Sequence, residues 1–563
     1  MSGAIAISDA LAELLDKAPS RGSNGDITYG LALPKLRDGR TISFAELVLP
    51  KGFPEHAVAR IRLPFDAVLR VPHVEADGLL CIDGDPGPGR GLDATQRVES
   101  LVYNFYHQFL HQWDNGDLDF DFAKEPQNYW EVNVSRLRTK DDAARVVWTV
   151  DDVPRKARVR EGLLLQPMKL VVAADDENPY VQRVIESLGH RAKQRVRVII
   201  ADIPISHSFV PTTWPRNLDA LLTLLRARLK PPELQRYLKQ GLRRRRTREH
   251  RIALFRNAEG GFAYLLPGGP PSVREAESPY RGRRSRFRLS IQPLPVDRID
   301  PQWTVGRDQI SEVSARTKRH VVVMGAGALG SPVVEQLAKA GVGLISLVDA
   351  DLMETANIGR HLLGVPYVDR MKVEAVAEAV NKSHPSCVVR AYADTAERWL
   401  RSNSLKDVDV VLDLTGEGDV RWHLNEARRN HPCPLVVSWM EPFVAAAHVC
   451  ILTSETLWFS DNAPTTDRLK SLEAIDWPED VIRQVPGCSS RFQAYTAANA
   501  AYAVALVSEN ALRVIDGDVA SSNVLSWVRG RKFVDKHELR AKFRPWAEDA
   551  AEQVGVIKER PFV

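Results

Sequence analysis

The chain has few cysteines and no pair of them at metal-ligand spacing. Its 563 residues include five cysteines, and none of the five forms a CxxC motif. Paired CxxC motifs are typical of zinc sites, and clustered cysteines in short secreted chains are typical of disulfide frameworks. The sequence therefore favours a reduced, cytoplasmic protein that holds no zinc.

Long apolar runs and a strong net charge are also missing. No segment approaches the roughly 18 apolar residues of a membrane-spanning helix, and the N-terminal stretch lacks the basic start of a signal peptide. The formal net charge of +4 is small for this length. Because the protein has no strong overall field, we expect neither a membrane nor a nucleic-acid partner.

A glycine-rich loop follows a short apolar strand in the C-terminal half. The segment "VVVMGAGALGSPVVEQLAKA" contains Gly325, Gly327 and Gly330 and continues with helical spacing. The next predicted strand ends at Asp349, near the offset of about 20 residues at which an acidic side chain meets a ribose hydroxyl. Glycines let the backbone approach phosphate, and a helix N-terminus supplies N–H groups. This pattern alone fits a nicotinamide and ATP equally well.

Cationic residues after the loop favour ATP. Asn357, Arg360 and Lys372 follow in "ANIGRHLLGVPYVDRMKVEAV". Arginine and lysine near a phosphate loop suit a triphosphate whose pyrophosphate must leave. A dehydrogenase would not need so cationic a segment at this place.

These segments resemble the adenylating domain of ubiquitin-activating enzymes and their bacterial ThiF and MoeB relatives. The resemblance covers roughly residues 298–510 and rests on "GAGALG", "DAD", "NIGRH" and Lys372. It implies that Asp349 holds the ribose of ATP and that Asn357, Arg360 and Lys372 contact the phosphates. Arg307 in "WTVGRDQ" is similar to the arginine that reaches the partner protomer's site, which implies a homodimer. From its own surroundings, Arg307 fits a solvated residue before a strand equally well.

The family's magnesium-binding aspartate is missing from the corresponding strand end. The stretch "VVLDLTGEGDVR" has Gly416 and Glu417 where the family has an Asp-Asn pair. Magnesium is satisfied by one or two carboxylates together with substrate oxygens. The candidates are Asp413, Glu417 and Asp419, and we take Asp413 as the predicted metal ligand.

Cys488 is the predicted nucleophile of the C-terminal half. It stands in "QVPGCSSRF", where a Pro-Gly loop precedes an alanine-rich helix, and a helix N-terminus lowers a thiol pKa. The "PGC" segment also resembles the family's thioester cysteine, which captures the acyl adenylate. Cys387, Cys433 and Cys450 lie in strand-like or strand-entry segments and are expected to be inert. We expect His448 to be a core histidine.

Cys81 ends an expected antiparallel meander in the N-terminal part. The following segment predicts an amphipathic helix whose apolar stripe, from Val98 to Trp113, belongs to a core. Taken alone, Cys81 fits a buried strand-end cysteine. The order of elements resembles a ubiquitin-conjugating domain over about residues 20–150, which implies that Cys81 accepts a carrier thioester. His73 stands near that family's His-Pro-Asn motif, but the asparagine is absent.

The middle of the chain predicts strand, helix and strand, like half of a Rossmann fold without its glycines. We expect a nucleotide-free linker domain there. Two basic runs, Arg243–Arg251 and Arg281–Arg288, are expected to be solvated faces. The alternative is a docking surface for an acidic partner or nucleic acid.

Together these features predict an α/β multi-domain chain. Residues 1–160 would form an α+β ubiquitin-conjugating-like domain, 161–297 a degenerate Rossmann-like linker domain, and 298–563 a doubly wound ThiF-type adenylation domain. This order resembles the conjugating enzymes of type II CBASS antiphage operons. The resemblance implies that the C-terminal glycine of a carrier, a cGAS-like nucleotidyltransferase, is activated with ATP and magnesium. It further implies transfer through Cys488 and Cys81 to a lysine of a target protein.

Three other functions remain open from the sequence. A ThiF/MoeB-like sulfur-carrier adenylyltransferase would need no conjugating domain, and many of its members hold zinc in CxxC pairs that are absent here. A nicotinamide oxidoreductase would need a second-substrate site, which the sequence does not reveal. A non-enzymatic scaffold would explain the missing magnesium aspartate and the missing asparagine.

Overall fold

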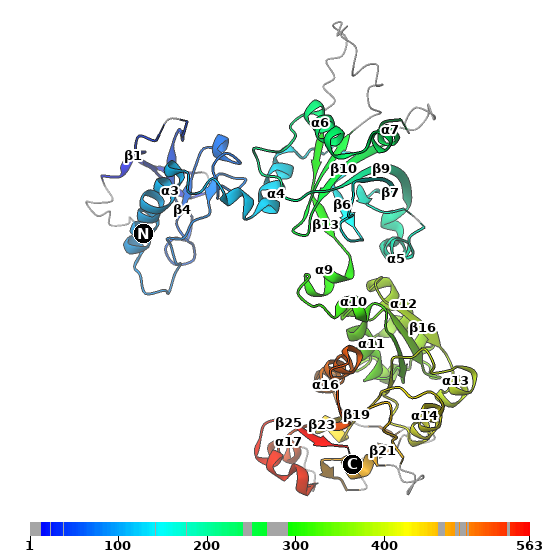
Figure 1. Ribbon diagram of the computed structural model, residues 1–563. Coiled ribbons are helices and arrows are strands. Elements are labelled where there is room, and N and C mark those ends of the chain that lie inside the picture. The colour runs from blue at the N-terminus through cyan, green and yellow to red at the C-terminus, as the bar shows by residue number, and fades with distance from the viewer. Residues whose placement is uncertain are drawn as a thin grey trace. The chain divides into compact units, whose positions relative to one another are not determined.

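The computed structural model divides into two compact units. The first runs to Asp176 and continues over His190–Arg298, and the second contains Glu177–Gly189 and the chain from Ile299 onward (Figure 1). None of the helices described combines the length and the apolar composition that crossing a membrane requires. The residues described are 13–22, 24–37, 39–140, 142–175, 177–239, 250–266, 291–459, 468–478, 483–484, 491–492, 495–536 and 541–562.

An antiparallel meander opens the first unit. Register places Leu47 between Tyr29 and Ile61, and all three side chains are buried, so one column of the sheet is apolar. The alternation of apolar and polar residues thus produced the expected hairpins. The five strands pair in chain order: β1 (Leu15–Arg21), β2 (Ile27–Leu31), β3 (Ala45–Leu49), β4 (Arg60–Arg62) and β5 (Leu79–Leu80).

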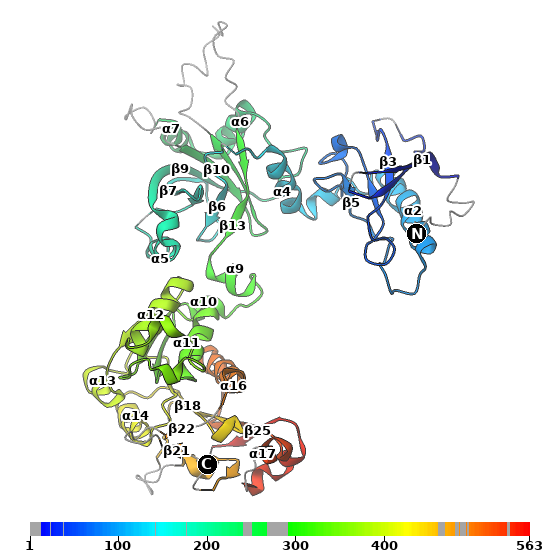
Figure 2. The same cartoon turned by 180° about the vertical axis from the view of Figure 1, so that it is seen from behind.

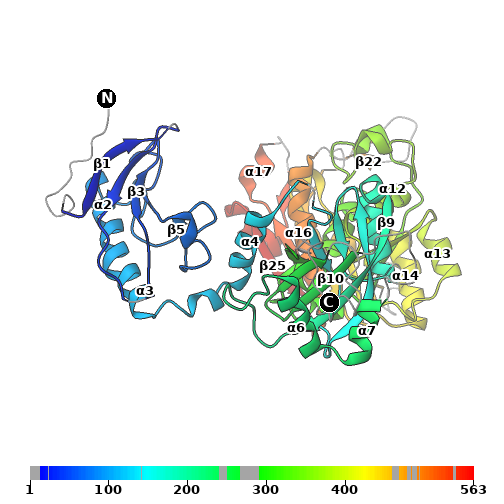
Figure 3. The ribbon, with the colours of Figure 1, turned by 90° about the horizontal axis from the view of Figure 1, so that it is seen from above.

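One long helix covers the meander (Figure 3). It consists of α2 (Ala94–Tyr103), a π-helical segment η2 (Asn104–Leu110) and α3 (His111–Asn115). Asp93 begins it with a capping box to Gln96. The prediction that its apolar stripe is core is confirmed, since the stripe packs against the sheet: Val98, Leu101, Val102, Phe105, Tyr106, Phe109, Leu110 and Trp113.

The rest of the first unit is an eight-stranded sheet. Helix α4 (Pro126–Leu137) lies against it, and the Trp130 indole donates to the Leu294 carbonyl at 2.9 Å. Helices α6 (Leu218–Arg228) and α7 (Pro231–Lys239) contribute to the same core. The strand order is β12 (Gln292–Leu294), β11 (Gly261–Leu266), β10 (His250–Arg256), β9 (Gln194–Pro204), β7 (Arg158–Gln166), β8 (Leu170–Val172), β6 (Val146–Thr149) and β13 (Val296–Arg298).

This sheet differs from the parallel half expected from the sequence. The short turn over residues 167–169 folds β8 back on β7, so β7 lies between β8 and β9 and is antiparallel to both. The sheet also takes in β6, which the expected division placed in the N-terminal domain. Helix α5 (Pro179–Leu188) belongs to the second unit. The sequence pattern predicted the strands and the helix, but it did not predict which strands pair or which unit the helix joins.

The two basic runs lie mostly in residues 240–249 and 267–290, outside the described residues. Arg251 is described, as part of β10, and it is fully buried. Its Nε donates to the Tyr237 carbonyl at 2.9 Å. The expectation of a solvated face is therefore wrong for Arg251, because strand β10 carries it into the core.

The second unit is a doubly wound α/β domain, as the sequence predicted. Its sheet begins with five parallel strands and ends with three antiparallel ones. The strand order is β16 (Val388–Tyr392), β15 (Leu344–Val348), β14 (His320–Met324), β17 (Val410–Asp413), β18 (Leu435–Met440), β19 (Ala446–Leu452), β23 (Asn523–Val528) and β25 (Val556–Pro561).

Helices lie on both sides of this sheet (Figure 2). Successive side chains of a strand such as β14 point to opposite faces. Val321 and Val323 pack with helices α11 (Gly330–Lys339), α12 (Lys372–Ser383) and α16 (Ala497–Asp516). Val322 and Met324 pack with α13 (Ala396–Ser402) and α14 (Gly418–Asn430). The chain order of the strands reverses between β14 and β17, and ligands of open α/β sheets bind beside the strand ends at such a point.

Candidate active sites

The three glycines after β14 have different roles. Gly325 has a φ of +93°, and a Cβ there would lie 3.1 Å from the backbone of Leu414. A Cβ on Gly330 would lie 1.9 Å from the Gly325 carbonyl oxygen, so α11 begins too close to the loop for any side chain. By contrast, a Cβ on Gly327 would meet nothing within 4 Å. Gly325 and Gly330 therefore build the turn, and Gly327 keeps space open above it, as a bound phosphate requires.

Asp349, the predicted ribose ligand, is joined to the glycine loop. Its Oδ2 accepts from the Ala326 N–H at 2.7 Å, and its Oδ1 accepts from the Asp351 N–H at 2.8 Å. Burial raises the pKa of Asp349, while these two hydrogen bonds act in the opposite direction. Each carboxylate oxygen can accept more than one hydrogen bond, so the group can still receive a ribose hydroxyl.

Lys372 lies beside this acidic group. It is the first residue of α12, it is 8% exposed, and its Nζ donates to Asp351 Oδ2 at 2.8 Å. The charge of Lys372 also acts on the pKa of Asp349. The structure therefore brings Lys372 near Asp349, while the contacts of both residues with ATP remain predictions. Asp351 completes the cluster, and the sequence analysis assigned it no role although it ends "DAD".

Asn357 and Arg360 lie on the loop after β15. Asn357 Oδ1 accepts from the Glu354 N–H at 2.9 Å, so part of its amide shapes the loop. Arg360 donates to the Ala356 carbonyl and lies 5.8 Å from the centroid of the Tyr495 ring. Neither contact joins these side chains to Asp349, and their phosphate contacts remain predictions.

His361 and Ser331 tie this loop to the glycine loop. His361 Nδ1 accepts from the Leu363 N–H at 3.1 Å, so Nε2 carries the proton and donates to the Ala326 carbonyl at 2.8 Å. Ser331 Oγ donates to the Gly327 carbonyl at 2.8 Å and accepts from the Leu362 N–H at 3.2 Å. The sequence analysis assigned no role to either residue. The available signal for His361 was its place in the "GRH" segment.

We expect His361→Ala to destabilise the second unit by about 2–4 kcal/mol, because it leaves a buried N–H and a buried carbonyl without partners. Burial lowers the pKa of His361, so the folded protein holds it neutral. Its contribution to stability is therefore present above its ordinary pKa of 6.5 and is lost as the pH falls below it. Urea unfolding between pH 5 and 8 measures both effects. His423→Ala, at a partly exposed histidine, is the control. Equal stability of the two variants would show that His361 does not stabilise the fold by joining its loop to the glycine loop.

The carboxylate of Asp413 lies inside the fold and contacts neighbouring side chains. It is fully buried, its Oδ1 accepts from the Thr415 hydroxyl at 2.6 Å, and its Oδ2 lies 3.7 Å from Arg421 Nη1. Glu417 and Asp419 are exposed, on the loop and first helical turn that follow. An exposed carboxylate can meet a hydrated magnesium ion with less desolvation. Within the described ranges, no three His, Cys, Asp or Glu side chains are grouped to hold a metal ion.

Arg307 ends helix α9 (Pro301–Gly306). It is exposed and has a φ of +49°, and Asp308 after it also has a positive φ. A bulky residue rarely adopts this conformation. The backbone is held by the Arg307 N–H, which donates to the Trp303 carbonyl at 3.0 Å. An exposed arginine on a fixed turn is compatible with the predicted role toward a partner protomer.

The described cysteines differ in solvent exposure. Cys387, Cys433 and Cys450 are buried, whereas Cys81 is exposed. Burial raises the pKa of Cys387 to about 12 and also raises those of Cys433 and Cys450, so these three thiols are inert, as expected. Cys488, the predicted nucleophile of this half, lies outside the described residues.

The expected core role of His448 is confirmed. It is fully buried, its Nε2 lies 2.6 Å from Glu441 Oε1, and its Nδ1 lies 2.8 Å from Ser526 Oγ. Glu441 Oε2 also accepts from the Trp477 indole at 2.8 Å. All of these hydrogen bonds are internal to the fold, so His448 stabilises the core.

Cys81 directly follows β5 and lies among polar groups from distant parts of the chain. Its N–H donates to the His73 carbonyl at 2.7 Å. His73 Nε2 lies 2.9 Å from Asp121 Oδ2, and the His73 N–H donates to the Tyr129 hydroxyl at 3.0 Å. The sequence did not reveal Asp121 and Tyr129 as partners of His73. They are 48 and 56 positions away from it, and no local pattern marks such distant residues.

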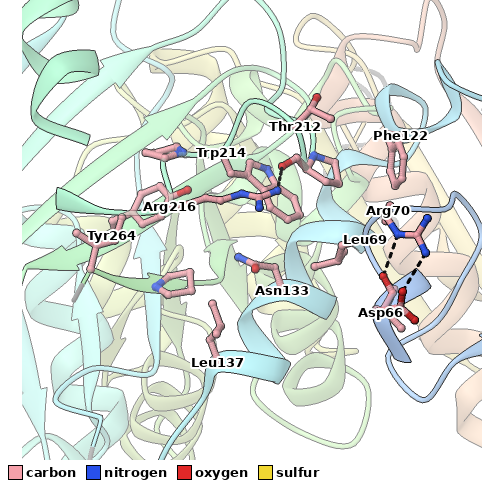
Figure 4. A pocket seen from close by; sticks show the side chains of 15 residues that line it. Asp66, Leu69, Arg70, Phe122, Asn133, Leu137, Thr212, Trp214, Arg216 and Tyr264 are labelled. Carbon is pink, nitrogen blue, oxygen red and sulfur yellow. Dashed lines mark hydrogen bonds and ion pairs between the residues drawn. The ribbon is translucent and has the colours of Figure 1, made fainter. Parts of the chain in front are cut away.

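A pocket of about 520 Å³ lies in the first unit (Figure 4). The rings of Phe122, Trp214 and Tyr264 give it an apolar lining, and Arg70 lies at it with a hydrogen bond to Asp66. Phe122 also packs edge-on against Tyr129, with ring centroids 4.7 Å apart. None of the residues predicted to be functional lines this pocket.

Known proteins resemble the chain in two ways. Residues 306–541 match the ThiF family, and this range contains the glycine loop, Lys372 and Cys488. Along most of its length the chain is homologous to the ATP-dependent ubiquitin transferase-like protein Cap2 of Pseudomonas aeruginosa (strain BWHPSA011 / Pa011). The two are 24% identical over 498 residues, which cover 83% of this chain and 84% of the relative.

Shorter regions are more similar to two other relatives. Over 158 residues the chain is 37% identical to the ATP-dependent ubiquitin transferase-like protein Cap2 of Enterobacter hormaechei, covering 27% of this chain and 26% of the relative. Over 128 residues it is 35% identical to the adenylyltransferase and sulfurtransferase UBA4 of Yarrowia lipolytica, covering 22% and 31%. These similarities support ATP-dependent activation of the ubiquitin-like kind.

Proposed function

We propose that this chain, a homologue of an ATP-dependent ubiquitin transferase-like protein with a ThiF domain, conjugates a protein carrier to target amines. The second unit adenylates the C-terminal carboxylate of the carrier. The acyl group then passes to Cys488, from there to Cys81, and finally to an amine. The proposal rests on two features of one chain. One is a glycine loop held by a hydrogen bond from His361, and the other is the exposed Cys81, which lies next to the paired His73 and Asp121.

The first step takes place at the glycine loop. A carboxylate oxygen of the carrier attacks the α-phosphate, the P–O bond to pyrophosphate breaks, and an acyl adenylate results. The open space at Gly327 supports phosphate binding there, and the hydrogen bond from the glycine loop to Asp349 supports its role as the ribose ligand. Arg360 and Lys372 offset the negative charge that develops on the leaving group. Magnesium, held by Asp413 or by the exposed Glu417 or Asp419, would supply further positive charge.

Two thiols then carry the acyl group. Cys488 attacks the adenylate, AMP leaves, and a thioester forms. Cys81 attacks that thioester in turn, and its exposure lets it meet both the donor and the acceptor. Arg307 reaches the site of a partner protomer, so the active form is a homodimer.

The carrier and the setting follow from the resemblance to type II CBASS conjugating enzymes. The carrier is a cGAS-like nucleotidyltransferase with a C-terminal glycine, the target is a protein lysine, and the reaction takes place in the cytoplasm during defence against phage. The name of the Pseudomonas aeruginosa relative, a ubiquitin transferase-like protein, supports a protein carrier.

A second candidate is the adenylation of a sulfur-carrier protein. It is supported by the similarity of 128 residues to an adenylyltransferase and sulfurtransferase. The two functions differ at Cys81, which a sulfur-carrier enzyme would not need.

The test is incubation of the full chain with MgATP and a lysate of its host, followed by a non-reducing gel and mass spectrometry. We expect thiol-sensitive adducts of one carrier on Cys488 and Cys81, and their formation should require ATP. A carrier adenylate without any adduct on Cys81 would favour the sulfur-carrier function. No carrier-dependent exchange of pyrophosphate into ATP would contradict both functions.

A further inference from the structure

His73 is fixed in an unusual conformation. Its φ is +61°, in the left-handed region that side-chain-bearing residues seldom adopt. Three hydrogen bonds hold it there, one from its N–H to Tyr129, one to its carbonyl from Cys81, and one between its ring and Asp121. A strained residue that is held from three sides is a common sign of a functional site.

The partner of the His73 ring is a carboxylate. The side chain of Asp121 is 7% exposed, and that of His73 is 28% exposed. Burial acts to raise the pKa of Asp121, but the hydrogen bonds from Lys124 and His73 outweigh it and hold that pKa below its ordinary value. An ionised carboxylate only accepts hydrogen bonds, so the proton of neutral His73 lies on Nε2 and the lone pair on Nδ1.

The backbone also places Cys81 next to His73: Val74 pairs with Leu80 in an antiparallel bridge, and the Cys81 N–H donates to the His73 carbonyl at 2.7 Å. Burial raises the pKa of the Tyr129 hydroxyl, and the negative charges of Glu125, Asp121 and Cys81 raise it further. Cys81 is exposed and stands beside the hydrogen-bonded pair of His73 and Asp121.

We propose that His73, oriented by Asp121, is the general base for attack of a primary amine on an acyl group carried by Cys81. This inference rests on the proposed function, because it requires the thioester. The amine nitrogen forms a C–N bond with the thioester carbonyl carbon, the C–S bond breaks, and its electron pair leaves on Cys81 Sγ. One proton moves from the nitrogen to His73 Nδ1 and then to the thiolate or to water.

The cluster supplies what the amine requires. A lysine ammonium has no free electron pair, so it first loses a proton to water; the neutral amine then attacks, and a base near the site removes a second proton from the nitrogen as the C–N bond forms. Asp121 stabilises the imidazolium that results, while Tyr129 acts as a positioning residue through the His73 backbone. The other charged groups at the cluster are Lys124, which pairs with Asp121, and Glu125.

The experiment is a single-turnover discharge of the full-length protein. Cys81 is loaded with carrier and MgATP, ATP is then removed, and loss of the thioester is followed after addition of either free lysine or hydroxylamine. Hydroxylamine is largely unprotonated at neutral pH and is a stronger nucleophile than lysine, so its attack depends much less on a base. We expect His73→Ala to slow discharge to lysine by about 100-fold and to leave discharge to hydroxylamine within a few-fold. We also expect added imidazole to restore part of the rate with lysine.

Two further variants complete the experiment. Asp121→Asn should slow discharge to lysine and change its pH dependence, because the imidazolium loses its carboxylate. The exposed His56→Ala is the control and should behave as the wild type. Normal loading of Cys81 shows that a variant is folded. If His73→Ala and Asp121→Asn both load Cys81 normally and discharge to lysine at the wild-type rate, His73 is not the general base. The proposed function would stand in that case. Absence of a thioester on wild-type Cys81 overturns the proposed function and this inference with it.

Discussion

Cys488→Ala should abolish every carrier thioester, whereas Cys81→Ala should leave an adduct on Cys488 and stop ligation to amines. The expected loss of ligation in either variant is at least about 1,000-fold, since a covalent nucleophile has no substitute in a two-step transfer. The effects differ because Cys488 acts first. Non-reducing gels with mass spectrometry of the adducts measure both, with MgATP and the carrier present.

Cys433→Ala is the matched control for these variants. Cys433 is buried, burial raises its pKa, and we expect its removal to leave both adducts in place. An adduct on Cys81 in the Cys488→Ala protein would contradict the order of the relay. Ligation that persists in Cys81→Ala would show that the first unit does not carry the acyl group.

Gly327→Val should abolish ATP binding and leave the fold intact. A Cβ at this position would meet no protein atom within 4 Å, so a valine side chain extends into the open space that the phosphates require. We expect an affinity loss of at least about 100-fold, or about 2.8 kcal/mol, with Tm changed by less than about 2 °C. Calorimetric titration with MgATP and thermal unfolding measure the two quantities.

Two other glycines serve as comparisons. Gly330→Ala places a Cβ 1.9 Å from the Gly325 carbonyl, so we expect a clear loss of thermal stability. A Cβ on Gly364 would also meet no atom within 4 Å, but this glycine lies outside the glycine loop, so we expect Gly364→Val to bind ATP normally. If Gly327→Val bound ATP as the wild type does, the open space would not be the phosphate site.

Features that depend on neighbours in the chain were predictable from the sequence. The glycine loop and the apolar stripe from Val98 to Trp113 are confirmed, and the strand predicted to end at Asp349 ends one residue earlier, at Val348. The period of apolar residues reports secondary structure directly, and glycines at a strand end report a tight turn. The inert state of three cysteines was predictable for the same reason, because each stands in or beside an apolar strand.

Features that depend on which elements become neighbours were decided only by the tertiary structure. The sequence could not show that β7 lies between β8 and β9, since its pattern fits either order. Nor could it show that Asp413 faces Arg421. The sequence by itself determined where the glycine loop and the candidate cysteines stand, and only the structure showed that Cys81 is exposed. Only packing between distant segments placed Asp121 and Tyr129 at His73, because long-range contacts arise from the burial of whole faces and leave no local spacing in the chain.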